Sequence, residues 1–191
     1  MRYRIECRSD YLHFLEADRR SLGLARKKNL LFGNEIFVFQ VRLRRLEYAS
    51  NCGKSFMRVL YHRYLFRRIS IKLGFSISPN TFGPGLSIAH RGTIVVNGGA
   101  KIGANCRIHV DVNIGTEAGK ADSAPTIGDN CYIGPGAKIF GAIEIGSNTV
   151  IGANAVVNRS WPEGNQTIAG VPARIVSNST SEGLLIRGYQ P

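Results

Sequence analysis

From Ile127 onward, an aliphatic side chain recurs at every sixth position of the chain, and glycine often follows it directly. A small or modestly sized apolar residue recurs four positions after most of these aliphatic residues. A period of six matches neither the 3.6-residue repeat of an α-helix nor the alternation of an ordinary hairpin strand. The aliphatic series comprises Ile127, Ile133, Ile139, Ile145, Ile151 and Val157.

This period predicts a mainly β fold, a parallel β-solenoid of triangular cross-section in which each hexad forms one side. The aliphatic residue would point inward, and the glycine would allow the bend at each corner. The pattern continues upstream in two other phases, so that it covers residues 76–160 and about four coils of three hexads each. A sandwich of unrelated short strands would not keep six consecutive hexads in register. The upstream series are Phe82, Ile88 and Ile94, and Val96, Ile102, Ile108 and Ile114.

The segment before the repeats lacks the period of six and favours helices, because capping residues and glycines bracket its apolar runs. Pro79 marks the expected start of the solenoid. We therefore predict a helical domain over residues 1–75, a solenoid domain over residues 76–176 and a C-terminal tail over residues 177–191. The predicted helices run from the N-cap Ser9 to about Leu22 before Gly23, from the N-cap Asn34 to about Ala49, and from Lys54 to Leu73 before Gly74.

The net charge of +12 is concentrated in the helical part. Residues 1–75 hold 17 Lys and Arg against 6 Asp and Glu, whereas residues 76–191 hold 8 against 7. Basic clusters such as 42–45 and 67–68 could contact phosphates, but the segment matches no nucleic-acid-binding motif, so we expect no nucleic-acid partner. Because aromatic residues are interleaved with these charges, the helices could lie against an anionic membrane face, or their charges could simply be solvated.

The N-terminus lacks the apolar core of a secretory signal, and no apolar run is long enough to cross a bilayer. The four cysteines show no paired spacing typical of a metal or redox site. We therefore expect a cytoplasmic protein with reduced thiols, whose basic helices could reach the inner face of the membrane.

Besides the six-residue period, the chain contains short motifs, some within the hexads and one after the last hexad. With them, the chain resembles the acetyl-CoA-dependent hexapeptide-repeat acyltransferases. Residues 76–176 look like the β-helix of serine O-acetyltransferases, and the short basic helical part is similar to relatives of those enzymes in surface-polysaccharide pathways. The resemblance implies a left-handed β-helix, a homotrimer with sites between subunits, acetyl-CoA as the acyl donor and no metal. The matching stretches are Ile88-Ala-His90, Ile94-Val-Val96, Ile114-Gly115, Ile133-Gly-Pro-Gly-Ala-Lys-Ile-Phe-Gly141 and Ala169-Gly-Val-Pro-Ala-Arg-Ile175.

The resemblance places the family's catalytic histidine at His90, two residues after the inward-pointing Ile88. As a general base, His90 would take the proton of an acceptor hydroxyl while the oxygen attacks the thioester carbonyl, because imidazole has a pKa close to neutral pH. A backbone N–H near the coil corner would stabilise the oxyanion. His109, beside Asp111, is a second candidate, which could be a base, an acceptor ligand or an outward surface residue.

The resemblance also assigns the pantetheine arm of CoA to backbone atoms beside small residues, in the groove between neighbouring subunits. Arg159 and Arg174 could meet the phosphates of CoA, which suit the arginine fork, or could be solvated surface charges. The segment Thr116–Ala124 is expected to loop out near the groove, where it could select the acceptor. The positions that match the pantetheine site are Gly115, Gly134, Pro135 and Ala153.

Three features that bind the amino-acid acceptor in serine acetyltransferases are missing from the matching positions. These are the aspartate before the catalytic histidine, the acidic residue that orients the histidine, and an Arg-His pair that grips the carboxylate. Each lost charge-assisted hydrogen bond is worth roughly 1.5–3 kcal/mol. We therefore expect a sugar hydroxyl of a surface-glycan pathway as the acceptor, with serine as the alternative. At the respective positions this chain has Ala89, Ser76, and Ser123 with Ala124.

Two other functions occur on solenoids of this kind. A zinc site like that of the carbonic anhydrases needs three converging histidines, and the repeats contain only His90 and His109. A non-catalytic scaffold is the further alternative, and binding of acetyl-CoA would distinguish an enzyme from it.

Overall fold

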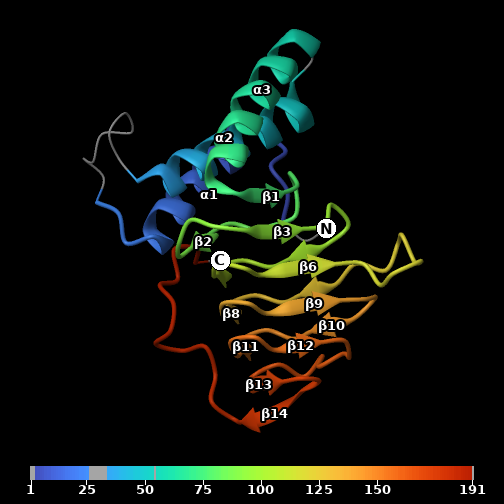
Figure 1. Ribbon diagram of the computed structural model, residues 1–191. Coiled ribbons are helices and arrows are strands. Elements are labelled where there is room, and N and C mark those ends of the chain that lie inside the picture. Colours follow the sequence, from blue (N-terminus) through green and yellow to red (C-terminus); the bar gives the residue numbers. More distant parts are fainter. Residues whose placement is uncertain (1–2, 26–33, 54, 191) are drawn as a thin grey trace.

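The computed structural model describes residues 3–25, 34–53 and 55–190. Three helices lie at one end of a stack of short strands, and the C-terminal segment runs back along the stack toward the helices (Figure 1). The helices are α1 (Arg8–Ser21), α2 (Glu35–Cys52) and α3 (Phe56–Leu73). No helix in these described ranges is long and apolar enough to cross a membrane.

The strands form three sheets, which are the three sides of a parallel β-helix. Sheet A contains β1 (Phe75–Ile77), β3 (Ile94–Val96), β6 (Asn113–Gly115), β9 (Lys138–Phe140) and β12 (Val156–Val157). Sheet B contains β4 (Lys101–Ile102), β7 (Thr126–Ile127) and β10 (Glu144–Ile145). Sheet C contains β2 (Ser87–Ile88), β5 (Arg107–Ile108), β8 (Tyr132–Ile133), β11 (Val150–Ile151), β13 (Thr167–Gly170) and β14 (Ala173–Ser177).

The chain passes from sheet A to sheet B to sheet C in every coil. Isolated parallel bridges from Phe82 to Ile102 and from Ile145 to Trp161 extend sheet B by one position at each end. The described chain therefore makes five coils rather than the four predicted. The six-residue period did not predict the last coil, because the spacing of its inward residues is irregular. These residues are Val157, Trp161 and Ile168.

The aliphatic residues that recur every six positions fill the interior, as predicted. All six members of the series from Ile127 to Val157 have exposed fractions of 2% or less. The parallel register stacks like on like, so that Ile108 pairs with both Ile88 and Ile133 on neighbouring coils. Burying each such side chain contributes about 1.5–3 kcal/mol to the stability of the solenoid.

The bends between sheets B and C depend on asparagine rather than on the glycines that follow the aliphatic residues. The bend asparagines have φ between 52° and 58°, in the left-handed region that asparagine tolerates. Their side-chain amides also form a ladder of hydrogen bonds of 2.9–3.1 Å along the solenoid. Gly128 is needed instead for close approach, since a Cβ there would lie 2.6 Å from the backbone nitrogen of Ser147. The ladder comprises Asn105, Asn130, Asn148 and Asn165.

Two predicted helix signals are confirmed. Asn34 caps α2, and its Oδ1 accepts a hydrogen bond from the N–H of Ile36 (3.0 Å). α3 ends at Leu73, and Gly74 follows it in the left-handed conformation with a φ of 78°. Both signals are local, because a cap needs only a few neighbouring residues.

The predicted start of the first helix was wrong. The N-cap of α1 is Cys7 and not Ser9. The Asp10 carboxylate accepts hydrogen bonds from the N–H groups of Glu6 (2.9 Å) and Cys7 (3.1 Å), which allows the helix to begin two residues before the expected position. The bond from the N–H of Glu6 is also the largest cause of the lowered pKa of Asp10.

Other boundaries also differ from the prediction. α2 continues past Ala49 and ends before Gly53. The solenoid begins at Phe75, directly after the glycine that ends α3, rather than at Pro79. Lys54, the predicted start of the third helix, lies outside the described residues, and Ser55 caps α3.

A completely buried guanidinium joins the helices to the first coil. Arg44 of α2, which belongs to the basic cluster 42–45, has no exposed surface. It donates hydrogen bonds to Asp18 of α1 (2.8 Å) and Glu47 of α2 (3.0 Å). It also donates to the carbonyl oxygens of Phe82 (2.9 Å) and Gly83 (2.7 Å) in the first coil. None of the alternatives given for this cluster, a phosphate contact, a membrane face or a solvated charge, applies to Arg44, because two carboxylates and two carbonyls surround its guanidinium.

The carboxylates of this cluster hold the first coil as well. Asp18 Oδ1 accepts hydrogen bonds from the N–H groups of Gly85 and Leu86 (2.9 Å each), and Glu47 Oε1 accepts one from the N–H of Asn80 (2.7 Å). Burial raises the pKa values of both carboxyl groups, and the charge of Arg44 opposes this shift. The three side chains therefore form one interdependent unit.

We expect Arg44→Met to lower the free energy of unfolding by about 3–5 kcal/mol, because it leaves Asp18 and Glu47 buried without their cation. Urea denaturation followed by circular dichroism measures this change. Arg45→Met, on the exposed side of the same helix, is the matched control and should change stability by about 0.5 kcal/mol or less. Equal losses in the two variants would contradict the role given to Arg44.

Candidate active site

His90 lies on the corner between sheets C and A, two residues after the buried Ile88, and its side chain is exposed. The next residue, Arg91, forms an ion pair with Glu35 of α2 (2.9 Å). The N–H of Gly92 donates a hydrogen bond to the carbonyl of Leu73 (3.1 Å). The corner that carries His90 is therefore tied to the segment that connects α3 with β1.

The register of sheet C places four corner residues in a row along the solenoid. Because Ile88, Ile108, Ile133 and Ile151 are paired in register, the residues that follow them leave sheet C at the same corner, which has five residues in the first coil and four in each of the next three. Neighbouring coils lie about 4.8 Å apart, so the row is about 14 Å long. The row consists of His90, Val110, Pro135 and Ala153, with His109 and Gly134 one position before their row members.

His109 is half-buried and lies between two other rings. Its ring centroid is 6.0 Å from that of His90 and 4.9 Å from that of Tyr132. Arg107 Nε donates a long hydrogen bond to His109 Nε2 (3.4 Å), and Arg107 also reaches Ser87 Oγ (3.4 Å). Burial lowers the pKa of His109, and the positive charges of Arg107 and His90 lower it further. The surroundings of this second histidine therefore favour its neutral form.

Sequence reasoning did not single out Arg107 or Tyr132. Both occupy the outward position just before an inward isoleucine, where the period places no constraint on side-chain type. Their pairing in sheet C, which joins residues 25 positions apart, brings them together beside His109. Only the register between coils could have identified them.

The remaining predicted donor-site residues lie elsewhere on the chain. Gly115 ends β6 and pairs with Phe140, so it lies at the corner between sheets A and B. Arg159 follows β12 at the same corner and is exposed. Arg174 is also exposed and pairs with Ala169 at the end of sheet C. One chain thus brings His90, His109, Gly134, Pro135 and Ala153 together but leaves Gly115 and Arg159 at another corner.

The segment Thr116–Ala124 projects from the solenoid between β6 and β7, drawn in yellow in Figure 1, as a loop of its own. Ser123 Oγ donates to the carbonyl of Lys120 (2.7 Å) and accepts from the N–H of Glu117 (2.8 Å). Glu117 and Lys120 also form an ion pair (2.9 Å). The loop is therefore held by its own contacts, at the corner that carries Gly115 and not at the corner of His90.

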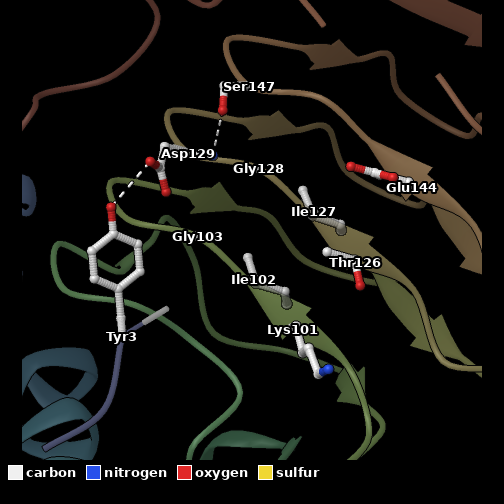
Figure 2. Close-up of a pocket in the computed structure, with 10 residues that line it drawn as sticks. All are labelled: Tyr3, Lys101, Ile102, Gly103, Thr126, Ile127, Gly128, Asp129, Glu144 and Ser147. Atoms are coloured by element: carbon white, nitrogen blue, oxygen red, sulfur yellow. Dashed lines mark hydrogen bonds between the residues drawn. The ribbon is translucent and has the colours of Figure 1, made fainter. Parts of the chain in front are cut away.

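A cavity of about 320 Å³ lies on the outer side of sheet B (Figure 2). Tyr3 points toward Asp129 there, and their side chains are hydrogen-bonded (3.1 Å). None of the predicted site residues lines this cavity, so we do not assign it to the reaction. Within the described ranges, no cluster of three or more His, Cys, Asp or Glu side chains could hold a metal.

We expect Arg107→Gln to raise the pKa of His109, because it removes a positive charge that disfavours imidazolium. In the wild type this pKa lies below the ordinary 6.5, so the folded state favours the neutral ring. The resulting stability is present above pH 6.5 and is lost as the pH falls through the folded-state pKa. NMR titration of the imidazole signals measures the shift, and Arg159→Gln should leave it unchanged. A His109 pKa that does not rise in Arg107→Gln would refute the electrostatic coupling.

Comparison with known proteins supports the relationship inferred from the motifs. Residues 124–159 match the family described as bacterial transferase hexapeptide (six repeats). The chain is 38% identical to a serine acetyltransferase of Buchnera aphidicola over 139 residues, which are 71% of this chain and 48% of that protein. The chain thus spans about half the length of that curated relative.

Two solved structures are similar over most of the chain. A truncated serine acetyltransferase apoenzyme is 32% identical with a TM-score of 0.69, over 87% of this chain and 68% of that one. A serine acetyltransferase in complex with CoA is 29% identical with a TM-score of 0.73, over 88% and 71% of the two chains. None of these three relatives is named as a polysaccharide enzyme. Since the repeat, the fold and the sequence agree, the chain belongs to the hexapeptide-repeat acetyltransferase family, built on the left-handed parallel β-helix.

Proposed function

We propose that this protein is an acetyl-CoA-dependent O-acetyltransferase in which His90 is the general base. The observation that carries the proposal is the corner between sheets C and A, where exposed His90 lies at the same corner of the solenoid as Pro135 and Ala153. Near the far end of the row of corner residues, Gly134 and the exposed Ala153 are small and would leave the backbone accessible to an extended thioester arm. The related structure that contains CoA supports acetyl-CoA as the donor.

The proposed reaction is a direct transfer. The acceptor oxygen attacks the thioester carbonyl while His90 takes the hydroxyl proton, and the C–S bond then breaks as the proton passes from His90 to the departing CoA sulfur. The ring of His109 lies 6.0 Å from that of His90, and its lowered pKa favours a neutral neighbour for the proposed base. A backbone N–H at the corner would stabilise the oxyanion.

The complete site would form between copies of the chain. Gly115, Arg159 and the loop Thr116–Ala124 lie at the corner between sheets A and B, whereas His90 lies at the corner between sheets C and A. We infer a homotrimer in which the His90 corner of one copy faces the loop corner of its neighbour. That arrangement would unite the two halves of the predicted donor site.

A sugar hydroxyl of a surface-glycan pathway is the proposed acceptor. Within the described residues, no carboxylate hydrogen-bonds the His90 ring, and the preceding Ala89 is apolar. The Ser123 hydroxyl is occupied by bonds inside its own loop, so it offers little to a substrate carboxylate. Serine is the second candidate, and the names of the relatives favour it.

We further propose that α3 lies against an anionic membrane on the cytoplasmic side. Its outward face carries an apolar stripe, Met57, Leu60, Tyr64 and Ile71, with exposed fractions of 69%, 48%, 56% and 72%. The helix holds five Arg and Lys and no Asp or Glu, so the stripe is flanked by cations on both sides. A second copy of this face would meet like charges, whereas anionic headgroups would neutralise them.

The test of the enzymatic proposal is release of CoA from acetyl-CoA across an acceptor panel that contains L-serine and several sugars. We expect turnover with a sugar, reduced about 10²- to 10⁴-fold in His90→Ala because the general base is lost. Binding of CoA to the variant, measured by calorimetry, should be retained. Turnover with serine alone would overturn the sugar proposal, and turnover independent of His90 would overturn its catalytic role.

The membrane proposal predicts co-sedimentation with phosphatidylglycerol vesicles, weaker binding in high salt and none to phosphatidylcholine vesicles. Leu60→Ser with Tyr64→Ser should weaken binding roughly tenfold, because less apolar surface enters the interface. Leu12→Ser, at a 54% exposed position on α1, is the matched control. If the α3 variant alters the oligomeric state and leaves vesicle binding intact, the stripe is a subunit contact and the proposal is wrong.

A further inference from the structure

A basic groove of about 290 Å³ lies between α3 and the first strand of sheet A. Arg63 and Arg67 of α3 line one side, one helical turn apart. Ser76 and Ser78, at the start of the solenoid, line the other side. No predicted donor-site residue lines the groove, so it is separate from the proposed CoA row.

The two arginines have no counter-charge of their own. Neither forms an ion pair with any residue in the described part of the chain, and no Asp or Glu lines the groove. Their neighbour Arg68 contacts the ring of Tyr64 instead (5.9 Å) and does not line the groove. Two guanidinium groups that line one groove without a carboxylate beside them are suited to an anionic ligand.

A hydroxyl group in the groove also lacks a partner. Ser70 Oγ is buried and makes no hydrogen bond, although buried hydroxyls are normally satisfied. It belongs to the same helix as the two arginines and lines the same groove. Exposed Ser76 adds a second hydroxyl from the opposite wall. The groove therefore offers the exposed Ser76 hydroxyl beside the two arginines, has the unpaired Ser70 hydroxyl beneath its surface, and contains no carboxylate.

The groove shares a wall with the segment that carries His90. The strand of Ser76 pairs with β3, and Ser76 itself lies opposite Val95. Just before these strands, the N–H of Gly92 donates to the carbonyl of Leu73, and the N–H of Ile94 donates to that of Gly74 (3.1 Å each). The wall of the groove is thus hydrogen-bonded to the segment that follows His90.

We propose that the groove binds the diphosphate of the acceptor, so that the sugar is acetylated while it is attached to a diphosphate carrier. The inference rests on the proposed sugar acceptor and specifies its chemical class. A diphosphate has two or three negative charges and many acceptor oxygens, which match two arginines and an exposed hydroxyl better than a single carboxylate does. The carrier could be a nucleoside or a lipid, since both contain the same diphosphate.

The test is calorimetric titration of the full-length protein with three probes: inorganic pyrophosphate, uridine diphosphate and farnesyl diphosphate. CoA is present at saturation throughout, so that phosphate sites of the donor are filled. We expect Arg63→Gln with Arg67→Gln to weaken pyrophosphate binding on the order of tenfold, because two charge-assisted contacts are lost. Arg68→Gln is the matched control on the same helix and should bind like the wild type. Tighter binding of uridine diphosphate or of farnesyl diphosphate than of pyrophosphate identifies the carrier.

Pyrophosphate binding that is unchanged in the double variant, or that vanishes when CoA is saturating, would overturn the proposal. His90→Ala separates the catalytic role of His90 from diphosphate binding in the groove, because it should bind pyrophosphate normally while transferring no acetyl group. His90-dependent transfer to a free sugar, together with unchanged pyrophosphate binding in the double variant, would leave the proposed enzyme intact and remove the diphosphate subsite.

Discussion

The need to satisfy one buried charge, that of Arg44, fixes the helices against the solenoid. A guanidinium without solvent requires partners on every side, and these come from α1, α2 and the first coil together. Asp18 then fixes the N–H groups of Gly85 and Leu86, directly before β2. Since β2 leads to His90 two residues after it ends, the same cluster positions the proposed catalytic base. Gln40 adds a further contact from α2 to the carbonyl of Leu86.

The corner between sheets B and C stabilises the fold. The asparagine ladder runs along this corner, and the C-terminal segment packs across it. Ser181 Oγ donates to the carbonyl of Asn130, and Tyr189 exchanges two hydrogen bonds with Asn105. Gly188 then reaches α1 through Ser21, so this segment connects the last coils to the helices (Figure 1). The tail thus leaves the His90 corner uncovered.

The candidate site was predictable from sequence only in part. A motif fixes what lies within a few residues of it, so His90, Gly134, Pro135 and Ala153 could each be selected from their hexads. The surroundings of His109 could not be predicted in this way. Arg107 and Tyr132 occupy outward positions that the period leaves unconstrained, and they meet only because β5 and β8 pair in register. The groove between α3 and β1 arises in the same way, from elements whose packing no short motif describes.

The sequence by itself determined the repeating interior, the family and the local caps at Asn34 and Gly74, because each depends on a period or on a few adjacent residues. The tertiary structure decided which charges are buried. Arg44 and Arg45 are adjacent in the chain, yet one is sealed between two carboxylates and the other faces solvent. The reason is that burial of a charge depends on partners from distant segments, here Asp18 and the carbonyls of the first coil. A pattern along the chain cannot specify those partners until the fold has brought them together.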